Sequence, residues 1–225
     1  NRWADCHGYT YRFEGQEFFN RVSPELRQKY LNQRIVLSDL ARLLWLREVR
    51  DEGFERVLWC DADLLVFKDF NPADLRESFG RECWVQSAGS GLRRYRRIHN
   101  AWMLFRARSP VLDFYLDRAL VLLDRAVPPL VPQFLGPKLL AAWHNIVAFD
   151  VEEQVGMLSP RAARDLLHGT GKALEMMLDG HGAPVAALNL CGSNLGRESD
   201  GVCHDAAHYL QLVQRLQQFG CAPIA

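Results

Sequence analysis

An apolar segment that runs into two aspartates constrains the fold of this 225-residue chain more than any other feature. Residues 55–60 contain Val57-Leu58-Trp59-Cys60, and they lead directly into Asp61-Ala62-Asp63 before a second apolar segment at 64–67. A short strand that is apolar on both faces belongs in the middle of a sheet that is covered on both sides. The sequence therefore predicts a strand that delivers Asp61 and Asp63 to the edge of a covered sheet.

Strand and helix signals alternate along the rest of the chain. This alternation predicts an open, Rossmann-like α/β sheet flanked by helices, whose ligands bind outside the ends of the strands. Helices are expected to begin at Ser23-Pro24, near Ser38-Asp39 and at Ser109-Pro110, because Ser and Asp are good N-caps and Pro suits the first helical position. Further helices are expected over 134–149 and 206–219, strands over 8–13, 83–86, 101–105 and 146–149, and loops over 169–182 and 192–201.

Composition favours one catalytic domain over residues 1–225, because 48% hydrophobic residues suffice for one sizeable core. Lys+Arg and Asp+Glu are both 27, so the zero net charge gives no sign of a nucleic-acid partner. No apolar run approaches the roughly 20 residues of a membrane span. The six cysteines form no C-x-x-C pair, which fits a reduced, cytoplasmic protein best. Disulfides in a secreted or Golgi-type protein remain the alternative.

An arginine cluster at 93–97 stands out against this neutral background. We expect it in a loop between two strands. Charge runs are usually solvated surface, which is the simpler interpretation. The functional alternative is a clamp for an anionic leaving group or acceptor, because Arg binds phosphate with two parallel hydrogen bonds.

Two carboxylates at positions i and i+2 after a strand suit a hard divalent cation. Mg²⁺ or Mn²⁺ takes oxygen ligands from one or two carboxylates and keeps waters and substrate phosphates as the others. A cation also relieves the repulsion between Asp61 and Asp63 and neutralises charge on a phosphate leaving group. An isolated D-x-D pair can equally be a solvated turn at a strand end, so its context decides.

That context resembles the GT-A glycosyltransferases of the family-thirty-two type, the DXD-sugar group that includes capsular polysaccharide and mannan-chain enzymes. The similarity covers about residues 36–150. It rests on four motifs. The D-x-x-R helix corresponds to Asp39-Leu40-Ala41-Arg42, and the strand with D-x-D corresponds to residues 53–63. The N-x-x-M strand followed by Ser-Pro corresponds to Asn100 to Met103 with Ser109-Pro110, and the G-P helix start corresponds to Gly136-Pro137. Leu135 stands where the family has threonine. The family's first strand has no counterpart before Asn1, which implies an N-terminally incomplete catalytic domain.

The resemblance implies a metal-dependent, retaining enzyme that moves a sugar from a nucleotide-sugar donor, a UDP-sugar above all, to a glycan or other hydroxyl acceptor. Asp61 and Asp63 would bind the ribose and the Mn²⁺ or Mg²⁺ ion. Asp39 and Arg42 would lie against the nucleotide and its phosphates, and Asn100 would contact the donor sugar. Each has a structural alternative: a helix cap for Asp39, an ion pair for Arg42 and a turn for Asn100.

A further metal ligand in such enzymes comes from the C-terminal part of the chain. Five residues are candidates, and we favour Asn194 and His204 over the other three, which are Asn189, Ser193 and His208. If the enzyme inverted, it would need a carboxylate base near the acceptor hydroxyl. The candidates for that base are Glu152, Glu153, Glu175 and Asp205.

Three other functions fit parts of the sequence. A haloacid-dehalogenase-like phosphatase would use Asp61 as nucleophile and Asp63 as acid/base, but Leu65 stands in place of Thr or Val and no G-D-x-x-x-D motif follows. A phosphate loop at Gly169-Thr170-Gly171-Lys172 fails because Leu166 and Ala173 occupy two of its required positions. A catalytically silent, glycan-binding relative remains the third alternative.

Overall fold

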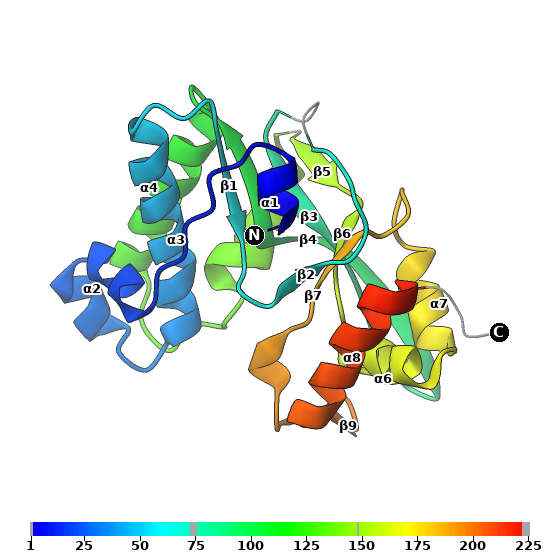
Figure 1. Cartoon of the computed structure of the whole chain (residues 1–225). Helices are drawn as coiled ribbons and strands as arrows, with labels where there is room; N and C mark the ends of the chain where they lie inside the picture. Colours follow the sequence, from blue (N-terminus) through cyan, green and yellow to red (C-terminus); the bar gives the residue numbers. More distant parts are fainter. Residues whose placement is uncertain (1, 73–75, 148, 222–225) are drawn as a thin grey trace. The chain divides into compact units, whose positions relative to one another are not determined.

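The computed structural model describes residues 2–72, 76–147 and 149–221, and it shows a mixed α/β fold with open sheets and flanking helices (Figure 1). The strands form three sheets with the orders β1-β4-β3-β5, β2-β7-β6 and β8-β9. Strand β7 pairs antiparallel with β2 and parallel with β6, so that sheet is mixed. The predicted α/β class is thereby confirmed.

The strands are short except for two. They are β1 (Arg56–Cys60), β2 (Leu64–Val66), β3 (Ser78–Ala88), β4 (Gly91–Arg106), β5 (Asp150–Glu152), β6 (Val155–Met157), β7 (Ala187–Asn189), β8 (Glu198–Ser199) and β9 (Val202–Cys203). The α-helices are α1 (Arg2–Cys6), α2 (Pro24–Lys29), α3 (Arg34–Asp51), α4 (Pro110–Arg125), α5 (Leu139–His144), α6 (Pro160–His168), α7 (Lys172–Leu178) and α8 (Ala206–Phe219). Further helical turns of other types are η1 (Gln16–Arg21), η2 (Phe134–Lys138) and η3 (Gly192–Asn194).

Capping side chains begin three of the expected helices where the sequence places them. Ser23 Oγ accepts from the backbone N–H of Leu26 at 3.3 Å, and Ser109 Oγ accepts from that of Val111 at 3.1 Å. Both helices have Pro at the first position, where no backbone donor is needed. Asp205 caps α8 in the same way and forms a capping box. Local signals therefore sufficed at these three helix starts.

Several expected elements differ in the structure. Helix α3 begins at Arg34, so Asp39 lies inside the helix and the cap interpretation of Asp39 is wrong. Residues 8–13 form no strand, and β5 begins at Asp150, after the strand expected over 146–149, of which residue 148 lies outside the described residues. Helix α7 occupies part of the loop expected over 169–182. Apart from α3, which has 18 residues, these segments are short, and tertiary contacts outweigh local propensity in short segments.

The arginine cluster lies in a strand, not in the expected loop. Strands β3 and β4 form a long hairpin whose turn is Gly89-Ser90, and residues 93–97 are part of β4. Gly89 has φ +59°, a conformation that glycine adopts without strain. The expected strands at 83–86 and 101–105 are real, but they are the middle of β3 and the end of β4.

The chain divides into two compact units, each built from segments that are distant in the sequence. Unit 1 comprises residues 1–59, 73–79 and 102–150, and unit 2 comprises 60–72, 80–101 and 151–225. In unit 1, buried leucines of α3 and α4 pack beside an aromatic cluster in which Phe79 contacts Phe105 and Tyr115. Asp39 and Arg42 belong to unit 1, whereas Asp61 and Asp63 belong to unit 2.

Unit 2 has a core built from α6, α7, α8 and the strands β3 and β7, with Leu65 of β2 packed against it (Figure 1). Leu166, Met177, Leu188 and Leu216 are fully buried in it. Burial of a leucine-sized side chain contributes about 1.5–3 kcal/mol to the free energy of unfolding. This core therefore supports β7, the strand that carries Asn189.

The glycines that suggest a phosphate loop have structural roles at the junction of α6 and α7. Gly169 ends α6 in the left-handed conformation at φ +88°. A Cβ on Gly171 would lie 2.2 Å from the carboxyl carbon of Asp165, whose Oδ2 accepts from the N–H groups of Ala173 and Leu174. The first amides of α7 are thus occupied by Asp165 of the chain itself.

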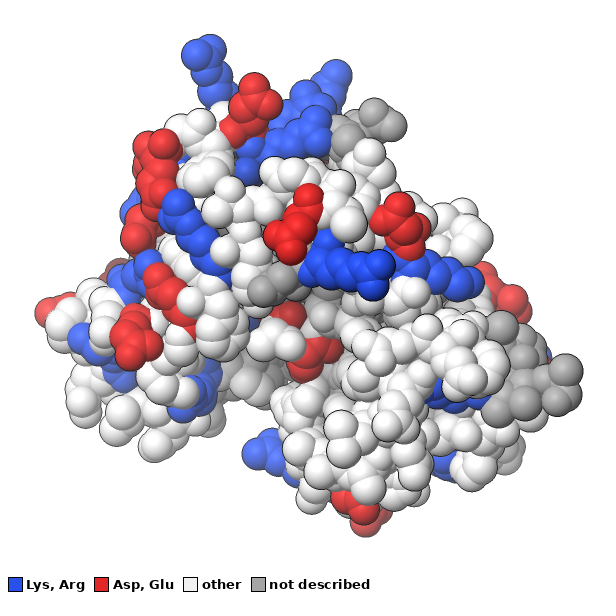
Figure 2. Space-filling model, viewed as in Figure 1, with Lys and Arg blue, Asp and Glu red and all other residues white. Residues whose placement is uncertain are grey.

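The described surface carries both signs of charge. On the face in Figure 2, Lys and Arg side chains alternate with Asp and Glu side chains and form no continuous basic stripe over the described residues. No described helix is both long and apolar enough to cross a membrane. All six cysteines are described, and each has a free thiol.

Candidate functional site

Asp61 and Asp63 lie in the turn that joins β1 to β2. The N–H of Asp61 donates to the carbonyl of Ala101 in β4 at 2.9 Å, which extends the pairing of β1 by one residue. The carbonyl of Asp61 accepts from the N–H of Leu64 at 3.0 Å and closes the turn. Both aspartates are half-buried, so part of each residue is exposed to solvent.

Both carboxylate oxygens of Asp63 are positioned by hydrogen bonds within unit 2. Oδ1 accepts from Nδ2 of Asn189 at 2.8 Å, and Oδ2 accepts from the N–H of Gly192 at 2.6 Å. Hydrogen bonds to an ionised acceptor are stronger than neutral ones and fix its orientation. Each oxygen keeps a second lone pair, so the carboxylate can still bind a cation.

The backbone after β7 is shaped to approach Asp63 closely. Leu64 pairs with Asn189 across the antiparallel ladder, which brings the end of β7 beside the turn. Asn189 Oδ1 accepts from the N–H of Cys191 at 2.8 Å, and Cys191 adopts φ +53°, which is uncommon for a residue with a side chain. A Cβ on Gly192 would lie 3.2 Å from Asp63 Oδ2. Asn189, Cys191 in its left-handed backbone conformation, and Gly192 thus together position the Asp63 carboxylate.

The electrostatic environment of this turn is negative. Burial raises the pKa of the Cys191 thiol well above its ordinary value, and the negative charges of Asp63, Glu82 and Asp61 raise it further. The Tyr209 hydroxyl donates to the carbonyl of Cys191 at 2.8 Å. Burial, with smaller effects of Cys191 and Asp63, raises the pKa of Tyr209 to about 12. Three carboxylates therefore act on one buried thiol, and a cation would be attracted to this place.

Glu82, in β3, is the member of this group that sequence reasoning missed. Only 6% of the residue is exposed, and its Oε2 has no hydrogen-bond partner among the described atoms. Burial raises its pKa to about 7, although the positive charge of Arg97 works in the opposite direction. A buried, unsatisfied carboxyl is rare in folded proteins and is typical of a functional site. The sequence signal was an acidic residue directly before the apolar segment Cys83-Trp84-Val85.

We expect Glu82→Gln to stabilise the protein at alkaline pH. The folded-state pKa of Glu82 is raised from 4.5 to about 7, so ionisation favours the unfolded state as the pH rises through this interval. Above pH 7 the ionised Glu82 therefore lowers the unfolding free energy of the parent protein by at most about 3 kcal/mol, and below about pH 4 it has no such effect.

Urea unfolding at pH 8 and at pH 4 measures this difference. The matched control is Glu198→Gln, which removes the exposed carboxylate of β8. An equal effect of Glu82→Gln at both pH values would contradict the proposed burial of a charge.

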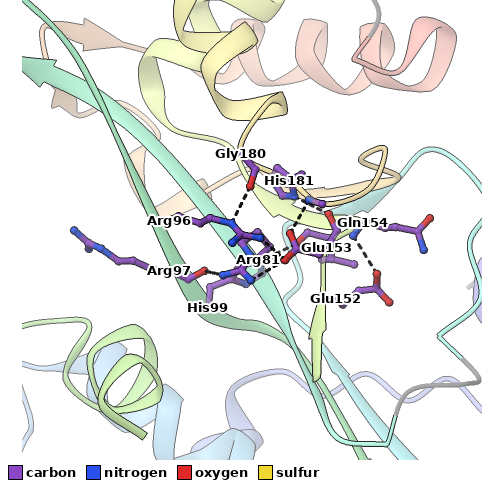
Figure 3. A network of polar contacts seen from close by, with 11 residues as sticks. Arg81, Arg96, Arg97, His99, Glu152, Glu153, Gln154, Gly180 and His181 are labelled. Atoms are coloured by element: carbon purple, nitrogen blue, oxygen red, sulfur yellow. Dashed lines mark hydrogen bonds and ion pairs between the residues drawn. The ribbon is translucent and has the colours of Figure 1, made fainter. Parts of the chain in front are cut away.

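The arginine cluster of β4 divides into two pairs. Arg94 donates to the carbonyl of Met176. Arg96 donates to the carbonyl of Gly180 and also binds Glu153 Oε1 at 2.7 Å (Figure 3). The guanidinium groups of Arg93 and Arg97 each lie 5.0 Å from the centre of the Tyr95 ring. Two arginines of the cluster therefore support the fold of unit 2, and Arg97 lies near Glu82.

Glu153 is the centre of the network in Figure 3. Its Oε1 accepts from both Arg81 and Arg96, and its Oε2 accepts from the N–H of Gly182 at 2.9 Å. These hydrogen bonds hold its pKa below the usual value despite the opposing effect of burial. The Glu153 carbonyl accepts from His181 Nδ1 at 2.6 Å. Glu153 is thus a structural carboxylate.

The other carboxylates proposed as an alternative catalytic base are also engaged. Glu152 Oε1 accepts from the N–H of Gln154, Glu175 pairs with Lys172, and Asp205 caps α8. Unlike these carboxylates, Glu82 has a buried oxygen without a hydrogen-bond partner among the described atoms.

The residues assigned to the nucleotide have well-defined surroundings. Arg42 Nη2 lies 3.2 Å from Asp39 Oδ1 in α3, and both side chains are buried. The Arg42 guanidinium lies 5.3 Å from the centre of the Trp59 ring, two residues before Asp61 in the chain. Asn100 is buried within β4, so the turn interpretation of Asn100 is wrong. Asn100 directly precedes Ala101, the residue whose carbonyl binds Asp61.

The five candidates for a further ligand do not converge on one point. Asn189 contacts Asp63, as described above, and Ser193 and Asn194 follow in η3. His204 is buried, and its Nε2 lies 3.1 Å from the carbonyl of Pro160. His208 belongs to the capping box of α8. Among the described residues, no three His, Cys, Asp or Glu side chains are grouped as ligands of one metal ion.

Comparisons with protein-family models, with curated proteins and with solved structures found no match to the chain. The site is therefore interpreted from its own residues.

Proposed function

We propose that the protein is a metal-dependent glycosyltransferase that moves a sugar from a nucleotide-sugar donor to a hydroxyl acceptor. The observation that carries this proposal is the Asp63 carboxylate, oriented through both oxygens by Asn189 and Gly192 beside Asp61 at the end of a strand. An oriented Asp63 carboxylate with a second aspartate two residues before it, in a negative environment, is suited to a divalent cation that carries phosphates. The proposal refines the α/β fold to the GT-A type.

The residues present fit Mn²⁺ or Mg²⁺ as the cation. Asp61 and Asp63 supply two carboxylates, and such ions in phosphate-transfer sites keep waters and substrate oxygens as their other ligands. No third His, Cys, Asp or Glu of the described residues is grouped with them as a ligand, so the other ligands would be waters and donor phosphates. The bound ion would neutralise charge on the diphosphate leaving group. Asp61 and Asp63 are its proposed ligands, and Asn189 positions Asp63.

The chain supplies further groups for the donor and the acceptor. Glu82 Oε2 is buried without a partner among the described atoms, and its carboxyl adds to the negative potential near the Asp61–Asp63 turn. Arg97 acts electrostatically on Glu82 and can balance a negative group of the donor. Arg42 and Asp39 of unit 1 are the proposed contacts of the nucleotide.

Calorimetric titration tests donor recognition without requiring an acceptor. We expect one nucleotide-sugar among a panel of UDP and GDP sugars to bind in the presence of Mn²⁺, and to bind at least tenfold more weakly in its absence. Glu198→Gln is the control variant, because that carboxylate is exposed. If no member of the panel bound with Mn²⁺, donor recognition by this protein would be ruled out.

We expect the transfer to retain the anomeric configuration of the donor. A retaining transfer needs no strong general base, because the leaving diphosphate can accept the acceptor proton. Glu152, Glu153, Glu175 and Asp205 all have structural partners, which agrees with this expectation. Proton NMR of the first product from an α-linked donor measures the outcome. A β-linked product would make the enzyme inverting and would identify Glu82 as the carboxylate to test as base.

A further inference from the structure

Tyr209 of α8 contacts the loop that positions Asp63. Leu212 and Leu216, which follow Tyr209 on the same helix, are buried in the core of unit 2. Residues at these spacings share one face of a helix, so α8 directs Tyr209 toward the interior of unit 2. The Tyr209 hydroxyl donates to the carbonyl oxygen of Cys191 at 2.8 Å. A helix that is packed on the core is thus connected to the loop after β7.

The carbonyl that Tyr209 binds belongs to the same peptide group as an amide that binds Asp63. The Cys191 carbonyl and the Gly192 N–H are the two polar bonds of this peptide group, and the N–H donates to Asp63 Oδ2 at 2.6 Å. The peptide group is trans and planar, so its C=O and N–H bonds point in opposite directions. A hydrogen bond that fixes the direction of the carbonyl therefore also fixes the direction of the N–H.

This peptide group needs support because Cys191 has an uncommon backbone conformation. Its φ of +53° and ψ of +53° lie in the left-handed region, which residues with a side chain seldom adopt. The Cys191 N–H donates to Asn189 Oδ1 at 2.8 Å. The Cys191 carbonyl accepts from the N–H of Asn194 and from the Tyr209 hydroxyl, both at 2.8 Å. Of these two donors, Tyr209 is the side chain, so a substitution can remove its hydrogen bond without changing the backbone.

The Tyr209 hydroxyl is available as a donor throughout the neutral pH range. Burial, with smaller effects of Cys191 and Asp63, raises the pKa of Tyr209 to about 12, so the hydroxyl keeps its proton. Donation to a carbonyl polarises the peptide group and strengthens the hydrogen bond that its N–H donates. The Tyr209 and His204 rings pack edge-to-face with their centres 6.4 Å apart, which restricts the rotation of Tyr209.

We propose that Tyr209 is a positioning residue of the Asp63 site. It holds the peptide group between Cys191 and Gly192 so that the N–H stays directed at Asp63 Oδ2, and the carboxylate is kept in one orientation for the cation. The effect on the cation rests on the proposed function. The orientation of the peptide group by Tyr209 does not depend on any activity.

Tyr209→Phe tests this role, because it removes the hydroxyl and keeps the ring. We expect the Mn²⁺ concentration that gives half-maximal nucleoside diphosphate release to rise about fivefold, which is the change in an equilibrium that one neutral hydrogen bond typically causes. The maximal rate at saturating Mn²⁺ should change little. A loss of folded protein would instead lower the maximal rate and leave the half-maximal Mn²⁺ concentration unchanged, so the two causes are separable.

Amide hydrogen exchange of Gly192, followed by NMR in the absence of metal, tests the positioning without requiring activity. We expect this N–H to exchange faster in folded Tyr209→Phe than in the parent protein. The matched control is Tyr115→Phe in unit 1, which removes a hydroxyl that donates to the carbonyl of Leu135 at 2.7 Å. This control should keep the parent's half-maximal Mn²⁺ concentration and the parent's exchange rate at Gly192.

Melting temperatures verify that both variants are folded. Unchanged exchange of Gly192 in Tyr209→Phe, or an unchanged half-maximal Mn²⁺ concentration, would overturn the positioning role of Tyr209 and leave the proposed function standing. A parent protein that bound no Mn²⁺ would refute the proposed function, and the exchange of Gly192 would then decide alone whether Tyr209 orients the peptide group.

Discussion

Asp61→Asn is expected to lower the rate of sugar transfer at least about a thousandfold, because a lost metal ligand removes several kcal/mol of leaving-group stabilisation. The substitution preserves size and the backbone hydrogen bond from the Asp61 N–H to Ala101. The melting temperature should therefore change little. Transfer rates with the preferred donor, compared at equal protein folded as judged by circular dichroism, measure the effect.

Asp63→Asn is compared with Asp61→Asn, because the Asp63 side chain also supports the fold. Its carboxylate accepts from Asn189 Nδ2 and from the N–H of Gly192, and an amide can accept with only one of its two terminal atoms. We expect this variant to lose activity and also about 1–3 kcal/mol of unfolding free energy. Full transfer by folded Asp61→Asn would refute the role of the pair, whatever Asp63→Asn showed.

Chelation is expected to abolish transfer reversibly. Asp61 and Asp63 are the proposed protein ligands, and two carboxylates hold such an ion loosely compared with a site built entirely from protein groups. Excess EDTA should reduce nucleoside diphosphate release to the background rate, and added Mn²⁺ should restore it.

The structural contribution of the metal should be small in the same experiment. The core of unit 2 is apolar and includes neither aspartate, so EDTA should leave the melting temperature of the protein alone unchanged. Undiminished turnover in excess EDTA would count decisively against a metal-bound diphosphate. A large fall in melting temperature would instead indicate a structural metal site.

The sequence predicted the parts of the fold that depend on local chemistry. Ser23-Pro24 and Ser109-Pro110 begin helices because a hydroxyl cap and a proline suit the first turn. The strand before Asp61 follows from an unbroken apolar segment, but its expected place in the middle of a covered sheet was wrong, because β1 is an edge strand beside β4 in which only Val57 is buried. The prediction of a loop at residues 93–97 was wrong. A cluster of arginines is typical of a solvated loop, but here the Gly180 carbonyl and the Glu153 carboxylate bind Arg96 within the fold.

The candidate site was predictable only in part for a similar reason. The pair Asp61 and Asp63 forms a local motif, but Asn189 reaches Asp63 across 126 positions of the chain. Its role depends on the register of β2 with β7, which a single sequence does not specify. Glu82 is proposed as functional because it is buried without a partner among the described atoms, and burial of that kind is a property of the folded chain.

Nucleoside diphosphate release from the nucleotide-sugar that binds best is the decisive assay for a metal-bound donor at Asp61 and Asp63. The assay compares the parent protein with Asp61→Asn, each with Mn²⁺ and each with excess EDTA. We expect release by the parent with Mn²⁺ only, and background rates in the other three reactions. Release that is equal in all four reactions, or absent from all four although the donor binds, would contradict the proposed function.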